Sequence, residues 1–195
     1  MENKQGEPMG MQAGGVSLDE GVRLLYDLSK EDLVRIIVDD AKNWLAHDGL
    51  WFQAVEQAFD METAISADQE AWRQFTVIEA QRIMNRLGIE PGGGISALAE
   101  CLKHRLYARL NLQEILQVGE NRAVLRMVDC RVQSARKRKG LNDFPCKSVG
   151  LIEYAEFARA IDPRIQTRCI ACPPDAHPER YWCAWEFTLE QVAAK

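Results

Sequence analysis

The stretch Gly88-Ile89-Glu90-Pro91-Gly92-Gly93-Gly94 divides this sequence into two halves with different periodicities. Glycine and proline are the strongest local breakers of regular structure, so a helix that reaches Leu87 is expected to end here. Upstream, apolar residues recur at helical spacing. Downstream, after one further helix, the spacing becomes typical of strands. The stretch therefore predicts helices first and a sheet second.

The upstream half predicts a long helical hairpin. A helix start is expected near Ser29, because Glu31 and Asp32 would then stand in the first turn, where acidic residues are favourable. The break between the two long helices is expected near 61–66. The predicted helices cover residues 22–28, 29–59, 67–87 and 95–104.

The downstream half predicts an antiparallel sheet with one inserted helix. The expected strands cover residues 107–118, 122–131, 165–171 and 181–189. A helix is expected over 148–161, and 132–140 is expected to be a short helix or a loop. Helices followed by hairpin strands are typical of an α+β fold. We expect a flexible tail over 1–17 and a single domain over 18–195, with its helical part about 18–105 and its sheet part about 106–190.

Composition limits the classes of function. The chain has 195 residues, of which 47% are hydrophobic and 27% are charged, so a folded domain is expected. A formal net charge of −5 argues against a nucleic-acid partner. No apolar run is long enough to span a bilayer, and no signal-peptide core is seen, so we expect no membrane partner and a cytoplasmic location. A small-molecule ligand or substrate is the expected partner, and a homodimer is left open.

The spacing of His47 and Glu79 predicts that they meet across the hairpin. With the turn near residue 63, the numbers of facing residues add to about 126, as 47 and 79 do. Trp44, His47, Asp48 and Trp51 share one helical stripe, and Glu56 lies within reach of the same region. An imidazole and a carboxylate so placed could ligate a metal or perform acid–base chemistry. The alternative is a structural hydrogen bond within an aromatic core.

Six cysteines supply a second group of candidates. Cys169 and Cys172 form a Cys-x-x-Cys step, a spacing that lets both thiolates face one ion. Three interpretations are open: a closed zinc or iron–sulfur site, a reactive thiol, and packing alone. The reactive thiol would be Cys130 or Cys146, which stand beside basic residues. The groups that could complete a metal site with the Cys-x-x-Cys step are Cys130, Cys146, Cys183 and His177.

Several segments resemble a family of uncharacterised prokaryotic cytosolic proteins. The segments that carry the resemblance are 43–52, 126–133, 143–147, 156–164 and 169–175. That family is grouped with L-2-amino-thiazoline-4-carboxylic acid hydrolase-like proteins and is described as metal-binding. The resemblance spans about residues 30–190. It implies a hydrolase but no particular catalytic residues, so the candidates below rest on spacing and residue type.

These patterns lead to one function hypothesis and two alternatives. The first is a metal-binding hydrolase of a small amide-like or cyclic amidine substrate, in which a divalent metal, zinc or iron first, activates a water. The expected metal ligands are His47, Glu79, Cys130, Cys146, Cys169 and Cys172, and the expected catalytic residues are Asp48, Glu56 and Cys130. The alternatives are a metal-free thiol enzyme, in which Cys130 or Cys146 is the nucleophile, and a non-enzymatic module that binds or senses a small ligand.

Overall fold

The computed structural model describes residues 20–189, so the tail expected over 1–17 lies outside the described residues. The chain divides into two compact units between Asn43 and Trp44. The described residues contain six α-helices and one four-stranded antiparallel sheet, which confirms the α+β class. No helix within residues 20–189 combines the length and the apolar content needed to cross a membrane.

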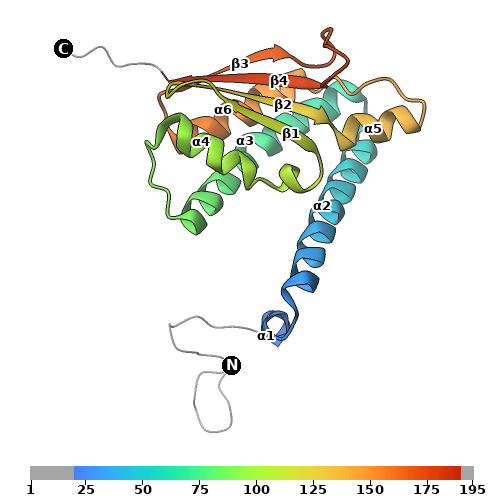
Figure 1. Ribbon diagram of the computed structural model, residues 1–195. Helices are drawn as coiled ribbons and strands as arrows, with labels where there is room; N and C mark the ends of the chain where they lie inside the picture. The colour runs from blue at the N-terminus through green and yellow to red at the C-terminus, as the bar shows by residue number, and fades with distance from the viewer. Residues whose placement is uncertain (1–19, 190–195) are drawn as a thin grey trace, which may run out of the picture. The chain divides into compact units, whose positions relative to one another are not determined.

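The helices and strands follow the expected order (Figure 1). The helices are α1 (Glu20–Tyr26), α2 (Lys30–Ala58), α3 (Met61–Leu87), α4 (Gly94–Lys103), α5 (Arg131–Arg138) and α6 (Lys147–Ile161). The strands are β1 (Leu112–Gln117), β2 (Arg122–Asp129), β3 (Ile165–Ala171) and β4 (Cys183–Leu189). The strand expected from residue 107 begins later, because residues 106–109 form a 3-10 helix.

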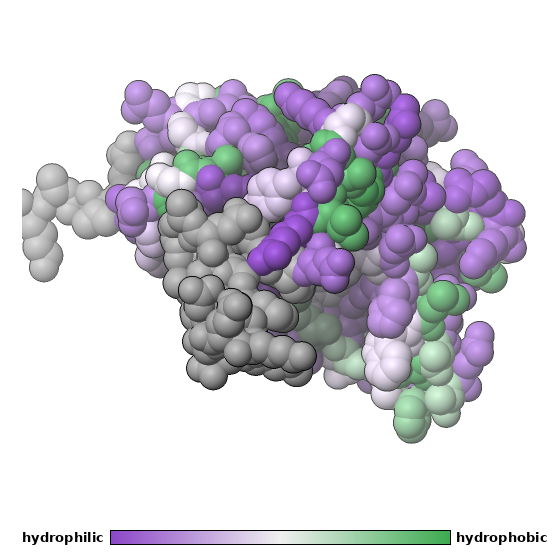
Figure 2. Space-filling model, turned by 90° about the horizontal axis from the view of Figure 1, so that it is seen from below, coloured by the Kyte–Doolittle hydropathy of each residue, from purple (hydrophilic) through white to green (hydrophobic). Residues whose placement is uncertain are grey.

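The first unit contains α1 and the start of α2. The hydroxyl of Ser29 accepts a hydrogen bond from the backbone N–H of Asp32 at 3.1 Å, which is the capping interaction expected at the start of a helix. Large apolar side chains here are exposed, among them Leu24 and Tyr26. Figure 2 shows one face of the molecule, on which hydrophobic side chains form scattered groups among hydrophilic ones.

The second unit is built on the sheet, whose strands lie in the order β1-β2-β4-β3. Leu125 of β2 and Cys169 of β3 both pair with Trp185 of β4, so these three side chains point to the same face. Trp185 contacts the ring of Tyr154 on α6 at 4.9 Å between centroids, which identifies this face as the one covered by helices.

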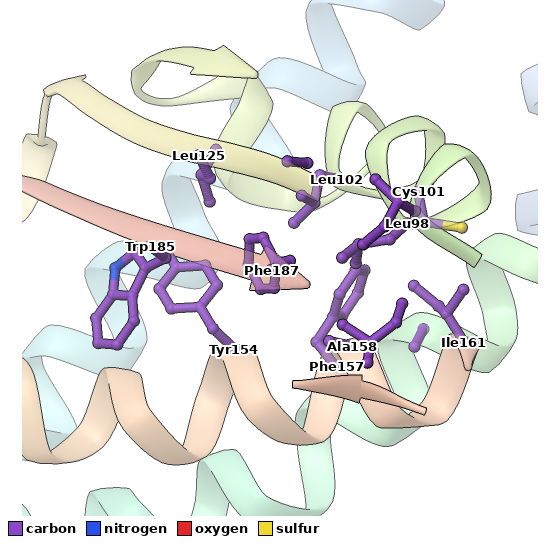
Figure 3. Packing of buried hydrophobic residues seen from close by; sticks show 14 of the residues in the cluster. Leu98, Cys101, Leu102, Leu125, Tyr154, Phe157, Ala158, Ile161, Trp185 and Phe187 are labelled. Atoms are coloured by element: carbon purple, nitrogen blue, oxygen red, sulfur yellow. The ribbon is translucent and has the colours of Figure 1, made fainter. Parts of the chain in front are cut away.

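The main core lies between this face and helices α3, α4 and α6. Figure 3 shows Leu98 and Leu102 of α4 together with Phe157 of α6, all turned toward Phe187 of β4. These four side chains are at most 1% exposed. Burial of large apolar side chains contributes roughly 1.5–3 kcal/mol each, so this cluster fixes α4 and α6 on the sheet.

The opposite face of the sheet carries charged residues. Glu186 of β4 accepts hydrogen bonds from Arg122 at 2.7 Å and from Arg168 at 2.6 Å, and the two arginines lie on the neighbouring strands. The two guanidinium groups hold the pKa of Glu186 below its ordinary value. This face of the sheet is thus occupied by ion pairs. The candidate site residues lie elsewhere, at one end of the sheet and on the helical hairpin.

Candidate acid–base cleft and thiol cluster

The turn of the helical hairpin lies at Phe59 and Asp60, earlier than the sequence predicted. The carboxylate of Asp60 accepts a hydrogen bond from the backbone N–H of Thr63 at 2.7 Å and so caps α3. With this cap, the helix begins at Met61 rather than near residue 67. The earlier turn changes which residues of α2 and α3 face each other.

Aromatic contacts establish the observed pairing of the two helices. Trp44 of α2 stacks on Phe75 of α3 at 5.4 Å and meets Trp72 edge-on at 5.9 Å between centroids. Asp48, one turn further along α2, interacts electrostatically with Asp68. The numbers 44 and 72, like 48 and 68, add to 116 instead of 126. The facing residues are therefore displaced by almost three helical turns along α3 from those expected.

The predicted pairing of His47 with Glu79 is not formed. The Glu79 carboxylate accepts hydrogen bonds from Arg105 Nε at 2.8 Å and from the backbone N–H of Leu106 at 3.0 Å. No hydrogen bond or ion pair joins His47 to Glu79 within residues 20–189. The physical reason is the displaced register, which takes Glu79 away from His47 and leaves it facing Arg105.

Arg105 is the centre of a buried ionic cluster. Its side chain is only 3% exposed and forms ion pairs with Glu79 at 2.8 Å and with Glu153 at 2.7 Å. The guanidinium carbon also lies 4.6 Å from the ring centroid of Phe157, within cation–π range. Burial raises the pKa of Glu153, and the Arg105 charge opposes that shift. Through Arg105, this cluster connects Glu79 of α3 to Glu153 of α6.

A pair of carboxyl groups lies on the α2–α3 hairpin. Burial, together with the charges of Asp48 and Glu153, raises the pKa of Asp68 to about 7, while a hydrogen bond with Trp72 opposes this shift. Burial also raises the pKa of Asp48, but the neighbouring His47 opposes this shift. The pKa values of both carboxyl groups are therefore raised, and a pKa of about 7 leaves Asp68 still partly protonated near neutral pH.

A cleft opens beside this pair. It has a volume of about 400 Å³ and is lined by Trp44, His47, Asp48 and Trp51. These are the four residues that the helical periodicity placed on one stripe, and the stripe is confirmed. Trp51 is 66% exposed and stands toward solvent, whereas Trp44 packs among the aromatic rings of α3. The cleft thus presents an acidic group between two indole rings.

Four of the cysteines, Cys130, Cys146, Cys172 and Cys183, lie near the end of the sheet where β2 and β3 finish and β4 begins. Cys130 precedes α5, Cys146 precedes α6, and Cys172 follows β3. The sulfur atoms of Cys146 and Cys172 are 3.5 Å apart. The Cys-x-x-Cys step therefore does not act as the expected pair: Cys169 stands in β3 opposite Trp185, and Cys172 turns to Cys146.

Tyr107 connects the carboxyl pair with the cysteine cluster. Its ring stacks on Trp72 at 5.7 Å between centroids. Burial raises the pKa of its hydroxyl, and Glu153, Asp48 and Cys130 are close enough to raise it too. Phe52 of α2 also contacts Phe144, just before Cys146, at 5.1 Å between centroids. The hairpin thus packs against the cysteine-bearing end of the sheet.

Comparison with known proteins identifies the family. A model of a family of unknown function, DUF6125, matches residues 26–189. The chain belongs to the DUF6125 family. No curated protein and no solved structure matches it. The DUF6125 match does not link the chain to L-2-amino-thiazoline-4-carboxylic acid hydrolase-like proteins or to metal binding.

The metal ligands expected in this DUF6125 chain are not brought together. Within residues 20–189, no three His, Cys, Asp or Glu side chains are grouped so that they could hold a metal ion. Glu79 is engaged by Arg105, and His47 lines the cleft. The expected ligand set is thus divided among the hairpin, the buried ionic cluster and the end of the sheet.

Two of the expected catalytic residues in this DUF6125 chain are poorly suited to that role. Burial raises the pKa of Cys130 to about 12, so its thiol keeps its proton near neutral pH. Glu56 lies two turns beyond Asp48 on α2, and no interaction with Asp48 or His47 is found in the described part of the chain. Asp48 is the expected catalytic residue that the structure places in the cleft.

Sequence reasoning missed several residues of this DUF6125 site. Asp68 could have been found, because it lies on the same side of its helix as Trp72 and Phe75, four and seven residues away. Arg105 gives no local signal, since it stands between α4 and the 3-10 helix. Gln133 is 1% exposed and its amide is directed at Cys146, but no local sequence pattern indicates this role either.

Proposed function

We propose that this protein is a metal-free hydrolase that cleaves a C–N bond in a small amide-like or cyclic amidine substrate. The observation that carries the proposal is the interaction of Asp68, whose pKa is raised to about 7, with Asp48, which lines a cleft between Trp44 and Trp51. Two carboxyl groups whose environments separate their proton affinities can serve as acid and base in one reaction. We place this chemistry in the cytosol, as the composition indicates.

The proposed mechanism gives each carboxyl group one proton transfer. The Asp48 carboxylate, favoured in its ionised form by His47, accepts a proton from a water that attacks the substrate carbon. Asp68 then donates its proton to the departing nitrogen as the C–N bond breaks. A carboxyl group with a pKa of about 7 is a suitable acid at neutral pH, because it is still substantially protonated there.

The lining of the cleft supports the proposed substrate class. An amidine is a planar cation near neutral pH, and a carboxylate can bind its two N–H groups in parallel. Trp44 and Trp51 offer aromatic faces beside Asp48, where a cation gains roughly 0.5–2 kcal/mol from each favourable face. An anionic substrate without a cationic group would meet Asp48 unfavourably.

The metal-dependent form of the hypothesis remains open to direct measurement. It needs at least three ligands around one ion, and within residues 20–189 no such group is assembled. Metal content should be measured on full-length protein purified without a nickel column. Less than about a tenth of an equivalent of zinc, iron, manganese or nickel supports the metal-free route, and a stoichiometric metal that turnover requires would contradict it.

The proposal is tested with L-2-amino-thiazoline-4-carboxylic acid as the substrate. Benzamidine serves as a separate ligand for measuring binding. Asp48→Asn and Asp68→Asn should each lower turnover by about 10²–10⁴-fold, the usual contribution of an acid or base. Glu70→Gln, an exposed position on the same helix as Asp68, serves as the control.

Benzamidine binding, followed by tryptophan fluorescence, separates catalysis from ligand recognition. Asp48→Asn should weaken the binding of benzamidine, because the substitution removes the carboxylate in the cleft. If the wild-type protein binds benzamidine but turns over none of a panel of cyclic amidines and small amides, the protein is a binding module and the hydrolase proposal fails. If Asp68→Asn keeps full turnover, Asp68 is not the acid.

A further inference from the structure

We propose that Cys146 and Cys172 form a redox-active dithiol that exchanges with small disulfides, independently of the carboxyl pair. Their sulfur atoms are 3.5 Å apart, although the residues belong to different elements. A disulfide bond is about 2.05 Å long, so closing it requires only a small rotation of the two side chains. Neither residue has a role in the proposed hydrolysis.

The backbone holds the two cysteines side by side. The N–H of Lys147, which follows Cys146, donates to the carbonyl of Pro173, which follows Cys172, at 2.9 Å. The carbonyl of Cys146 accepts a hydrogen bond from the N–H of Gly150 at 2.8 Å, as a residue that opens a helix does. The sulfur pair is therefore fixed on both sides by the ordered ends of α6 and β3.

A buried amide is directed at the Cys146 sulfur. Gln133 Nε2 lies 3.5 Å from Cys146 Sγ, and the same amide is held by two hydrogen bonds of 2.9 Å with the backbone of Phe144. Because both ends of the amide are engaged, Gln133 cannot turn away. It presents a donor to Cys146 that favours the thiolate form of that sulfur.

The two thiols differ in the way that an attacking and a resolving cysteine should. The hydrogen bond from Cys172 lowers the pKa of Cys146, and Gln133 adds to this effect. The pKa of Cys172 is raised by its interactions with Cys146 and Cys183, and the residue is 1% exposed. Cys146 is half-buried, whereas Cys172 is buried, as expected of an attacking thiol and a resolving thiol.

The exchange proceeds through two displacements at sulfur. The Cys146 thiolate attacks one sulfur of a disulfide R–S–S–R, an S–S bond forms between them, and the R–S–S–R bond breaks with release of RS⁻. Cys172 gives its proton to that RS⁻ and attacks Cys146 Sγ. The mixed disulfide breaks, and the second RS⁻ leaves. Two electrons pass from the protein dithiol to R–S–S–R, which is reduced, and the Cys146–Cys172 bond is formed.

The test uses reduced full-length protein and glutathione disulfide. After reaction, acid quenching and alkylation, peptide mapping by mass spectrometry should find Cys146 joined to Cys172. Cys172→Ser should stop the reaction at glutathione bound to Cys146, because the resolving thiol is missing. Cys146→Ser should abolish both products. Cys169→Ser is the matched control, because Cys169 lies within β3 and pairs with Trp185 of β4. It should leave the exchange unchanged.

A second measurement needs no substitution and therefore no refolding control. Iodoacetamide at limiting concentration should alkylate Cys146 of the wild-type protein about tenfold or more faster than Cys101, Cys130 or Cys169, whose pKa values are raised. Uniform labelling, a bond between Cys172 and Cys183 instead, or zinc held by these thiols in the purified protein would each overturn the proposal. Loss of hydrolysis in the Asp48 and Asp68 variants has no bearing on it.

Discussion

Burial and then the charge of Asp48, which acts across the α2–α3 hairpin, raise the pKa of Asp68. Each residue is partly buried, and each stands within one turn of an aromatic residue of its own helix, Trp44 or Trp72. Placing two carboxyl groups together in a poorly solvated region costs free energy unless one of them keeps its proton. A folded protein retains such an arrangement at a cost in stability, and that cost can be measured.

Replacing Asp68 should stabilise the protein at alkaline pH. Because its folded pKa of about 7 is above the unfolded value, the folded state binds more protons between about pH 4 and pH 7. Stability therefore falls as pH rises through this window, and the loss persists above it. We expect Asp68→Asn to exceed wild type by a few kcal/mol at pH 8 and to differ little at pH 4. Urea unfolding of both proteins at the two pH values measures this, and equal curves at pH 8 would contradict it.

Removing Arg105 should be strongly destabilising. Arg105→Met leaves Glu79 and Glu153 buried without their cation, which typically costs about 3–5 kcal/mol. Adding Glu79→Gln and Glu153→Gln to the same chain removes the unpaired charges and should recover part of that loss. The free energy of unfolding in urea is the measurement. If Arg105→Met alone is as stable as wild type, the buried cluster does not hold α3 and α6 together.

Two helical glycines should respond oppositely to alanine. A Cβ at Gly150 would come within 2.6 Å of the Trp185 ring, so Gly150→Ala should destabilise by about 1–3 kcal/mol. A Cβ at Gly49 would meet nothing within 4 Å, so Gly49→Ala should stabilise the helix by about 1 kcal/mol. Thermal unfolding of the two variants, which carry the same substitution, provides an internal comparison. The prediction is contradicted if both melting temperatures move in one direction.

Asp162 should stabilise the protein only while it is ionised. Its carboxylate accepts hydrogen bonds from the backbone N–H groups of Gly94 and Arg164, each at 3.0 Å, and from the Arg164 side chain. The Arg164 hydrogen bond lowers the pKa of Asp162. This contribution is present above the unfolded pKa, near 4, and is lost as pH falls through the folded value. Asp162→Asn should cost about 1–3 kcal/mol near neutral pH and less in acid, as urea titrations at both pH values would show.

The order and type of the helices and strands followed from local patterns. β3 occupies the residues predicted for it, α4 is shifted by one residue, and α6 begins one residue earlier than predicted, because glycine, proline and apolar spacing act over short distances. The start of α3 was missed because the Asp60 cap allows a turn of only two residues. That error of six residues changed every contact expected across the hairpin.

The sequence by itself determined the α+β class, the stripe of Trp44, His47, Asp48 and Trp51, and Cys146 as a candidate thiol. Only the tertiary structure decided that the charge of Asp48 acts on Asp68, that Glu79 pairs with Arg105, and that Cys146 lies beside Cys172 rather than in a metal site. The reason is physical. Helix and strand periodicity is encoded by neighbours in the chain, whereas the protonation and pairing of a side chain depend on burial and on charges that folding brings from distant segments.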